Sequence, residues 1–398
     1  MGARILLTTT VHWPSTARLV SAFAGAGALI DALLPAGHVA ARSRFLGRRH
    51  FYDPLFARRS LARAIAQGAP DLVVPCDDRA LAQLLQLAGR FPRLLERSLG
   101  RPASYPALMA RGDFMAAARA LGIAGPPTVA VRTEEDYHRA LAALGTPAVL
   151  KRDGSWGGDG VAIVRNPVQA AEAWRGLAVA PSRLRSAARA LLRRDAHFLR
   201  EALYPTPPVV SVQAFVPGTA ATSAFACWKG KVLAAIHMDV LETLHPRGPA
   251  TVLRRVPDPD MERAAILLAA HFGLSGLHGL DFVRDAEGKA QLIEINPRAT
   301  QTAALALGPG LDLAAALTGC LAGSAKARAA LTANPVIALF PQEWRRDPAS
   351  LWLHEAYPDV PWDDPAVLRA CLEPGEASPE RRGGGVSAAL TLRQAVGR

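Results

Sequence analysis

The stretch GLDFVRDAEGKAQLIEINPR, residues 279–298, decides the fold because it has the pattern of a two-stranded hairpin with its polar side chains on one face. Its turn is expected over Asp285–Gly288. If that turn holds an even number of residues, Asp281, Glu294 and Asn296 share one face, with Asp281 and Glu294 as near-diagonal neighbours. The opposite face then carries an apolar set that would face a core: Leu280, Phe282, Ile293 and Ile295.

The polar face of this hairpin has the composition of a metal site. Two carboxylates and one amide oxygen on a rigid hairpin suit Mg²⁺ that holds nucleotide phosphates. Arg298 follows two residues after Asn296. The alternative is the exposed face of an edge hairpin, but such a face would more often carry Lys, Thr or Ser. Asn296 directly before Pro297 would also be an unusual strand residue unless its side chain is required.

A second motif is the glycine-rich stretch KRDGSWGGDGV, residues 151–161, which follows the apolar run Pro147–Leu150. A P-loop carries its lysine after the glycines and feeds a helix, and a dinucleotide-binding loop also feeds a helix. Here Lys151 comes first and a strand follows. This order favours a flap whose backbone N–H groups cover phosphates while Lys151 pairs with them as a point charge. A flexible hairpin with a surface lysine is the alternative.

Composition limits the classes of protein to consider. A chain of 398 residues, half apolar and one fifth charged, is globular and long enough for two or three domains. The net charge of +12 is a weak sign of nucleic-acid binding, because 41 of the 46 basic residues are arginines and most are dispersed. Lys151 is one of only five lysines. Four scattered cysteines without a CxxC pair indicate reduced thiols and a cytoplasmic location. No uncharged stretch is long enough to span a bilayer.

The first hundred residues alternate between strand and helix patterns. We expect a strand over 4–10, a helix over about Ala17–Leu33 and a second strand around His38–Ser43. A helix over Leu61–Gln67, a buried strand in DLVVPCDD and a helix over Arg79–Ala88 follow. This alternation predicts a doubly wound α/β unit with a parallel sheet. The loop Thr8–Ser15 and the pair Asp77–Asp78 follow strand ends, where such sheets bind ligands, although they could equally be loop and cap residues.

Further along the chain, the pattern is mixed. A hairpin is expected over 222–240 with its turn at Lys229–Gly230, and an amphipathic helix over Met261–Phe272. A helical stretch should run from Arg298 to about Leu321. The basic segment Pro181–Pro208 fits either a solvated insertion or a lid for an acidic substrate. Residues 333–398 are rich in Pro, Gly and charge, which predicts a loosely packed appendage.

Three motifs in this order and spacing, KRDGSWGGDGV, VQAFVPG and GLDFVRDAEGKAQLIEINPR, resemble the ATP-grasp superfamily over roughly residues 106–325. The resemblance implies a preceding α/β domain over 1–105 and an ATP-grasp domain over 106–325. The latter would divide into a glycine-loop subdomain, about 125–212, and a metal-site subdomain, about 213–325, with a C-terminal appendage over 326–398. It also implies ATP bound between the two α+β subdomains, with Mg²⁺, or Mn²⁺ as an alternative.

The resemblance assigns roles to individual residues. Lys151 and the flap glycines Gly157, Gly158 and Gly160 would contact phosphates. The hinge residues Gln213, Ala214 and Val216 would hold adenine through the Ala214 carbonyl and the Val216 N–H. Asp281, Glu294 and Asn296 would bind magnesium, and Arg298 would steady the transferring phosphoryl group or the acyl phosphate. Three positions depart from the family pattern. Arg111 occupies the position of the family's first phosphate-binding lysine. Gln213 occupies a position that is often Glu, and Ala220 the position of an acidic residue that usually contacts the ribose.

The implied function is that of an ADP-forming ligase, in which ATP activates a small-molecule carboxylate as an acyl phosphate for attack by an amine or similar nucleophile. Arg254 and Arg255 are candidates to bind the substrate carboxylate, with an ordinary basic strand as the alternative. A phosphotransferase that stops at phosphoryl transfer, or a nucleotide-binding sensor without ligase activity, would use the same nucleotide site. A homo-oligomer is left open.

Overall fold

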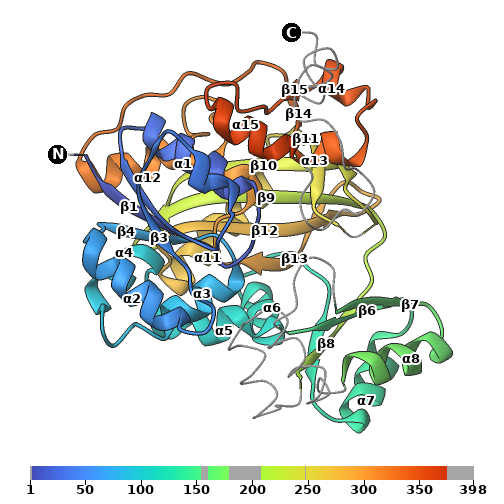
Figure 1. Cartoon of the computed structure of the whole chain (residues 1–398). Helices are drawn as coiled ribbons and strands as arrows, with labels where there is room; N and C mark the ends of the chain where they lie inside the picture. Colours follow the sequence, from blue (N-terminus) through green and yellow to red (C-terminus); the bar gives the residue numbers. More distant parts are fainter. Residues whose placement is uncertain (1, 154–159, 179–207, 247, 374–398) are drawn as a thin grey trace.

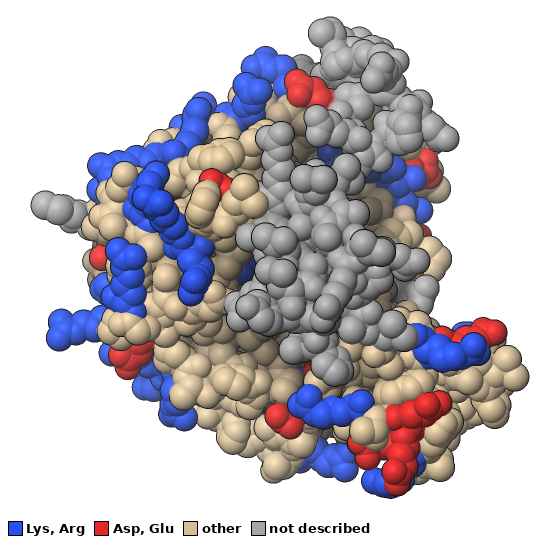
Figure 2. Space-filling view, turned by 60° about the horizontal axis from the view of Figure 1, so that its bottom comes forward, with Lys and Arg blue, Asp and Glu red and all other residues tan. Residues whose placement is uncertain are grey.

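The protein is described by a computed structural model (Figure 1) that covers residues 2–153, 160–178, 208–246 and 248–373. Gly157 and Gly158 of the predicted flap, and nearly all of the basic segment 181–208, lie outside the described residues. Of the helices that are described, none is both long and apolar enough to cross a membrane. On the face shown in Figure 2, the described basic side chains are scattered rather than gathered in one patch.

The N-terminal unit is a parallel four-stranded sheet in the order β3-β2-β1-β4, as predicted for a doubly wound α/β domain. Its strands are β1 Arg4–Thr8, β2 Leu29–Leu34, β3 Leu46–Phe51 and β4 Leu72–Pro75. The helices that follow them include α1 Ser15–Gly25, α2 Ala57–Gly68 and α3 Asp78–Leu85. The loop Thr9–Pro14 and the start of α3 therefore lie at the carboxyl edge of the sheet, where parallel sheets bind ligands.

Two expectations for this unit were wrong. The first helix does not run to Leu33, because α1 ends at Gly25 and Gly27 adopts a φ of +94° that a helix cannot continue through. The apolar run after it is the central strand β2, which is buried on both faces and so lacks the alternation of a half-exposed strand. The expected strand at His38–Ser43 is instead the short 3₁₀ helix η1 Val39–Arg42, and β3 follows it.

A second unit contains the glycine-loop motif. It is an antiparallel sheet in the order β5-β8-β6-β7, formed by β5 Thr128–Val131, β8 Val210–Ala214, β6 Ala148–Arg152 and β7 Val161–Val164. Two helices pack on it, α7 Glu134–Leu144 and α8 Pro167–Leu177, and the rings of Tyr137 and Trp174 stack between them with centroids 4.7 Å apart. In Figure 1 this unit projects from the lower right of the molecule.

The largest sheet has seven strands in the order β13-β12-β9-β10-β11-β14-β15. Its main strands are β9 Thr219–Trp228, β10 Lys231–Thr243, β11 Ala250–Arg255, β12 Gly276–Arg284 and β13 Ala290–Asn296. The predicted turn at Lys229–Gly230 joins β9 to β10, and both of its residues have positive φ. The helices α11 Pro259–Phe272 and α12 Leu313–Ala322 pack against this sheet. The other helices in the first half of the chain are α4 Pro92–Leu99, η2 Pro102–Ser104, α5 Tyr105–Met109 and α6 Arg111–Ala120.

The expectation of a loosely packed C-terminal part was wrong as far as Glu373. Strand β14 Val336–Ala338 pairs with β11 and extends the large sheet, and β15 Tyr357–Pro358 pairs with β14. Arg18 of α1 donates to both carboxylate oxygens of Asp359, at 3.2 and 2.5 Å. This part of the chain is therefore fastened to the N-terminal unit. Its remaining helices are α13 Gln342–Arg346, α14 Trp352–Glu355 and α15 Pro365–Leu372, with η3 Gln301–Ala304 preceding α12.

The hairpin of β12 and β13 differs from the expected one in its register. Arg284 pairs with Ala290, so the connection between them holds an odd number of residues rather than an even one. Asp281 nevertheless pairs with Glu294 while the next residue, Phe282, pairs with Leu292. Ile293 is the extra residue of a β-bulge, and Leu292 takes the core position that the sequence pattern assigned to Ile293.

Candidate active site

The polar residues singled out in the sequence meet where the three sheets approach one another. Lys151 lies near the end of β6, and Asp281, Glu294 and Asn296 lie on β12 and β13. Arg111 is the first residue of α6, and the adjacent Gly112 packs closely on β5. A Cβ added to Gly112 would stand 2.9 Å from the Ala130 Cβ, so a glycine there lets the start of α6 approach the sheet.

Glu294 is the centre of the cluster. The Arg111 Nη2 donates to its Oε1 at 2.9 Å, and the Lys151 Nζ lies 3.5 Å from its Oε2. The two cations come from different elements, α6 and β6, and are both buried, with Arg111 9% and Lys151 5% exposed. Both oxygens of the predicted metal ligand are thus paired with cations of the protein itself.

Asp153 is a member of the cluster that the sequence analysis did not single out. Its Oδ1 lies 3.2 Å from the Arg111 Nη1 and accepts a hydrogen bond of 3.3 Å from the Ser211 hydroxyl. Arg111 therefore bridges Asp153, which directly follows β6, and Glu294 of the large sheet. The position of Asp153 two residues after Lys151 in the glycine motif was the available signal, since a rigid strand end places both side chains near the same ligand.

Asp281 and Asn296 complete the predicted metal set. The Asn296 Nδ2 donates to the Asp281 Oδ2 at 2.8 Å, and the Thr222 hydroxyl of β9 donates to the Asp281 Oδ1 at 3.0 Å. Thr222 was also not singled out from the sequence. Mg²⁺ commonly binds one or two carboxylates together with substrate phosphates, and Asp281 and Glu294 supply that number on one face. The donor set therefore fits a divalent cation that binds along with a phosphate ligand.

Arg298 joins this cluster to the N-terminal sheet. Its Nη2 donates to the Asn296 Oδ1 at 3.1 Å, and its Nε lies 3.0 Å from the Asp78 Oδ1, an ion pair without the alignment of a hydrogen bond. Its guanidinium carbon lies 5.5 Å from the ring centroid of Trp13. Asp78 and Trp13 come from the carboxyl edge predicted to bind a ligand, and Trp13 is partly exposed.

Two effects oppose each other in the electrostatics of the cluster: repulsion between its carboxylates and attraction to its own cations. Burial and then the neighbouring Glu294 carboxylate raise the pKa of Asp281. Burial alone would also raise the pKa of Glu294, but Arg111 and Lys151 hold it below its usual value. Burial lowers the pKa of the Lys151 ammonium, although Glu294 opposes that shift. Two carboxylates that repel each other at one place form a site that a divalent ion would stabilise.

The predicted adenine hinge is the segment between β8 and β9. The Gln213 side chain is buried and donates to the Thr128 hydroxyl at 2.9 Å, so it supports the segment rather than facing an open site. The Ala214 N–H is bonded to the Pro127 carbonyl. Within the part of the chain that the structure describes, no acceptor faces the Val216 N–H. Ala220 is exposed at the start of β9 and, as an alanine, offers no polar side-chain group.

The structure separates the two arginines of β11. One row of paired residues crosses four strands and consists of Asp281, Thr222, Met238 and Arg255. Arg255 therefore lies on the face of the sheet that carries the predicted metal ligands. Arg254 pairs with Asp239 on the opposite face. Three strand spacings separate Arg255 from Asp281, about 14 Å between Cα atoms. Arg255 is exposed and is the better placed of the pair to reach a ligand at this face.

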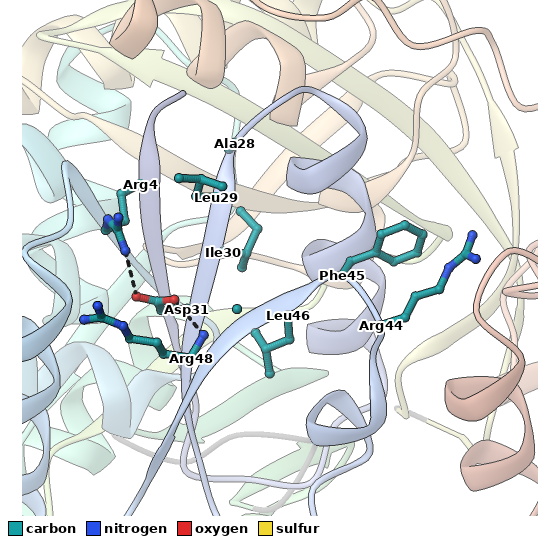
Figure 3. Close-up of a pocket in the computed structure, with 10 residues that line it drawn as sticks. Arg4, Ala28, Leu29, Ile30, Asp31, Arg44, Phe45, Leu46 and Arg48 are labelled. Carbon is teal, nitrogen blue, oxygen red and sulfur yellow. Dashed lines mark hydrogen bonds and ion pairs between the residues drawn. The ribbon is translucent and has the colours of Figure 1, made fainter. Parts of the chain in front are cut away.

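A pocket of about 410 Å³ lies at the opposite, amino-terminal edge of the parallel sheet (Figure 3). Its Asp31 carboxylate has partners: the Arg48 backbone N–H donates to the Oδ1 at 2.8 Å, and the Arg4 guanidinium lies 3.7 Å from the Oδ2. Arg44 packs on the Phe45 ring and points away from Asp31. The titratable groups converge at the cluster around Glu294 and not at this pocket, so the cluster is the better candidate for a functional site.

A family model and two curated relatives match parts of this chain. The model of an ATP-grasp domain matches residues 194–302, which include the metal set and Arg298. A formate-dependent phosphoribosylglycinamide formyltransferase from Oleidesulfovibrio alaskensis is 31% identical over 153 residues, 36% of this chain and 38% of that protein. The corresponding protein from Stenotrophomonas maltophilia is 35% identical over 131 residues, 32% of each chain. The chain thus matches about a third of the length of these relatives.

Solved structures resemble a larger share of the chain. The biotin carboxylase domain of Hydrogenobacter thermophilus 2-oxoglutarate carboxylase, solved with MgADP and bicarbonate, aligns with a TM-score of 0.59 at 14% identity, over 83% of this chain and 71% of that one. N5-carboxyaminoimidazole ribonucleotide synthetase from Thermus thermophilus aligns with a TM-score of 0.52 at 17% identity, over 74% and 71%. The architecture is therefore the ATP-grasp fold with a preceding α/β unit, as the sequence motifs predicted.

Proposed function

We propose that this chain, which has the ATP-grasp fold, is an ATP-dependent, ADP-forming ligase that activates a small-molecule carboxylate for attack by an amine or similar nucleophile. One observation carries the proposal: Arg111, Lys151 and Glu294 from three segments of the chain converge within hydrogen-bonding or ion-pairing distance. Cations beside a metal-binding carboxylate are what the transfer of a phosphoryl group requires, because charge develops on its oxygens.

The nucleotide would lie between the glycine-loop sheet and the large sheet. Lys151 and Arg111 would bind its phosphates, with Gly160 and the flap glycines Gly157 and Gly158 above them. The Val216 N–H, which has no hydrogen-bond acceptor among the described residues, and the Ala214 carbonyl would bind adenine, and this needs no particular side chain at either position. Because Ala220 offers no group for the ribose, the backbone of the hinge would carry more of the nucleotide's affinity.

Asp281, Glu294 and Asn296 would hold Mg²⁺, or Mn²⁺ in its place. When bound, the ion would neutralise the negative charge of the phosphate oxygens. The Asn296 side chain directs its amide nitrogen to Asp281 and its oxygen to Arg298. Its amide would therefore have to flip to direct the oxygen to the metal ion. Arg298 is held by Asp78 and lies above Trp13, and this fixed guanidinium would stabilise the charge of the phosphorylated carboxylate.

The substrates would enter at the carboxyl edge of the N-terminal sheet, because Arg298 links that edge to the phosphate-binding residues. There the nucleophile would displace phosphate from the activated carboxylate. Arg255 is our candidate to bind a second charged group of the carboxylate substrate. The curated relatives carry formate dependence in their names, so formate belongs among the acids to test. All four cysteines are unpaired, and we expect the enzyme to work in the cytoplasm.

The test is a panel of acids and amines with the purified full-length chain, Mg²⁺ and ATP. Formate, amino acids and other small carboxylates are each combined with amino acids and simple amines, and both ADP and phosphate are measured. A ligase releases the two in equal amounts only when both substrates are present. A phosphotransferase would instead leave the phosphate on its product, which ³¹P NMR would detect. Failure of the protein to bind Mg-ATP at all would refute the proposal.

A further inference from the structure

The oxygens of the proposed metal site are already occupied by groups of the protein. Arg111 and Lys151 take the two oxygens of Glu294, and Arg298 takes the oxygen of Asn296. The Asp281 oxygens accept from Asn296 and Thr222. A divalent ion that approaches Glu294 is repelled by both of these cations, so its binding is favoured when one of them withdraws.

Arg111 has a second partner to which it can withdraw. Its Nη2 donates to Glu294 while its Nη1 already lies 3.2 Å from the Asp153 Oδ1, and the Ser211 hydroxyl donates to that same oxygen at 3.3 Å. A guanidinium presents several donors in a fixed fork, so it can give up one carboxylate and keep the other. Lys151 has a single ammonium group, and no carboxylate other than Glu294 pairs with it among the described residues.

From this arrangement we propose that Arg111 is an internal counter-ion of Glu294 which is exchanged for the divalent cation when the nucleotide arrives, with Asp153 as the residue that keeps the guanidinium in place. The inference rests on the proposed function. In the free protein, Arg111 neutralises Glu294 and opposes binding of a metal ion alone. Once phosphates are present, the guanidinium can pair with them and with Asp153. The metal and the nucleotide therefore bind together and each strengthens the other.

The arrangement gives a physical reason for an arginine at this position. A lysine could neutralise Glu294 or a phosphate, but it could not keep a bond to Asp153 in the same orientation. Asp153 acts through Arg111 and is a positioning residue. Burial raises the pKa of its carboxyl, although Arg111 opposes that shift, so the carboxylate depends on the guanidinium for its charge balance.

The experiment measures Mn²⁺ binding by the loss of its free-ion EPR signal, with the full-length chain and no turnover. Titrations are made with Mn²⁺ alone and with Mn²⁺ plus a non-hydrolysable ATP analogue, and the signal lost to the analogue without protein is subtracted, because the analogue itself binds Mn²⁺. The wild-type protein should bind Mn²⁺ alone weakly and at least roughly tenfold more tightly with the analogue. Arg111→Met should tighten the binding of Mn²⁺ alone by about tenfold, because Glu294 loses a competing cation, and should weaken the binding of the Mn²⁺–analogue complex.

These opposite changes distinguish the proposed role of Arg111 from a structural role. Loss of a structural role would weaken the binding of Mn²⁺ alone and also of the Mn²⁺–analogue complex. Arg119→Met, at an exposed position on the same helix, is the matched control and should change neither of the two affinities. Arg111→Lys keeps the charge and guards against misfolding of the methionine variant; it should bind Mn²⁺ alone as weakly as the wild type. Asp153→Asn should leave that weak binding in place and reduce the gain caused by the analogue.

Two outcomes would contradict the proposals, and they differ. If Mn²⁺ binds equally with and without the analogue and Arg111→Met changes neither affinity, the counter-ion exchange is wrong while the nucleotide site stands. If neither Mn²⁺ nor the analogue binds to the wild-type protein under any condition, the proposed function itself fails.

Discussion

Asp281 and Glu294 lie directly opposite each other on β12 and β13, and they do so because a bulge at Ile293 corrects the register of the hairpin. With its odd-numbered connection and no bulge, Asp281 would oppose Ile293. The two carboxylates would then lie on different faces of the sheet. The bulge brings them together on the face that also carries Thr222 and Arg255.

Glu294→Gln should reduce ADP formation by at least about 10²-fold, because a neutral amide holds a divalent ion poorly. It should also lower the free energy of unfolding by about 1–3 kcal/mol, since Arg111 and Lys151 lose their shared carboxylate in a buried place. Nucleotide binding through the hinge should persist. Turnover and thermal melting are the measurements, with Glu287→Gln at the exposed turn of the same hairpin as the control. Wild-type turnover with unchanged Mg²⁺ dependence would reject the metal site.

Lys151→Met should lower turnover by roughly 10²–10³-fold, the loss typical when one donor to a transition state is removed. Its melting temperature should stay near that of the wild type, because the methionine fills the same buried space without an ion to desolvate. Lys231→Met, on the exposed start of β10, should change neither quantity. Near-normal turnover of the Lys151 variant would mean that this lysine has no role in phosphoryl transfer.

The two arginines of β11 lie on opposite faces of the sheet, so substituting each of them in turn tests which face binds the substrate. Arg255→Met should raise the KM for the carboxylate substrate by roughly ten- to a hundredfold and leave kcat within a few-fold, as expected when one charged hydrogen bond to the substrate is lost. Arg254→Met, on the opposite face, should leave both constants unchanged. Steady-state kinetics on the two variants is sufficient, and equal effects would exclude a role for Arg255 in binding.

Stability should fall in mild acid because two buried histidines resist protonation. Burial, and for His38 also the neighbouring His12, lowers the pKa of His38 and of His278 to about 4. The unfolded chain takes up these protons near its ordinary pKa of about 6.5, so the stability is fully present above that pH and is lost as pH falls toward 4. Between these two pH values, each histidine should lower the free energy of unfolding by about 1.4 kcal/mol for each unit by which the pH falls.

His38→Asn isolates one of these contributions. The His38 Nδ1 accepts from the Ala40 N–H at the start of η1, and asparagine is a good residue for such a cap. Urea unfolding is measured at several values between about pH 4.5 and about pH 6.5, the range between the pKa of this histidine in the folded state and its ordinary pKa. The variant should show a shallower dependence on pH than the wild type. Parallel curves would mean that His38 is protonated in the folded protein.

Asp359→Ala tests the attachment of the C-terminal part. It leaves the Arg18 guanidinium, which is largely buried, without its main partner, and should lower the free energy of unfolding by about 3 kcal/mol. Thermal or urea unfolding measures the loss. Asp363→Ala is the control, because Asp363 is more exposed and lies 4.0 Å from the same arginine. Equal stability of both variants would show that the ion pair does not fasten this part to α1.

Much of the fold followed from local sequence signals. The alternation of buried strands and helices predicted the parallel N-terminal sheet, and the motif around Lys151 with the hairpin ending in Arg298 predicted the ATP-grasp fold. The errors lay where local signals are weak. Strand β2 is buried on both faces, so its sequence does not alternate and has the pattern of the end of a helix. Residues 333–373 are rich in Pro and charge, yet they pack because partners distant in the sequence, such as Arg18 and β11, bind them.

For the site, the sequence by itself determined which polar side chains the two motifs contain, and we propose that these carry the chemistry: Lys151, Asp281, Glu294, Asn296 and Arg298. Only the tertiary structure decided how they are connected, because their distances depend on segments far apart in the chain. Arg111 and Asp153 become one bridge to Glu294 only when α6, β6 and β13 are brought together. The physical reason is that a motif fixes side-chain types and local spacing, whereas the pairing of buried charges depends on the packing of whole sheets and helices.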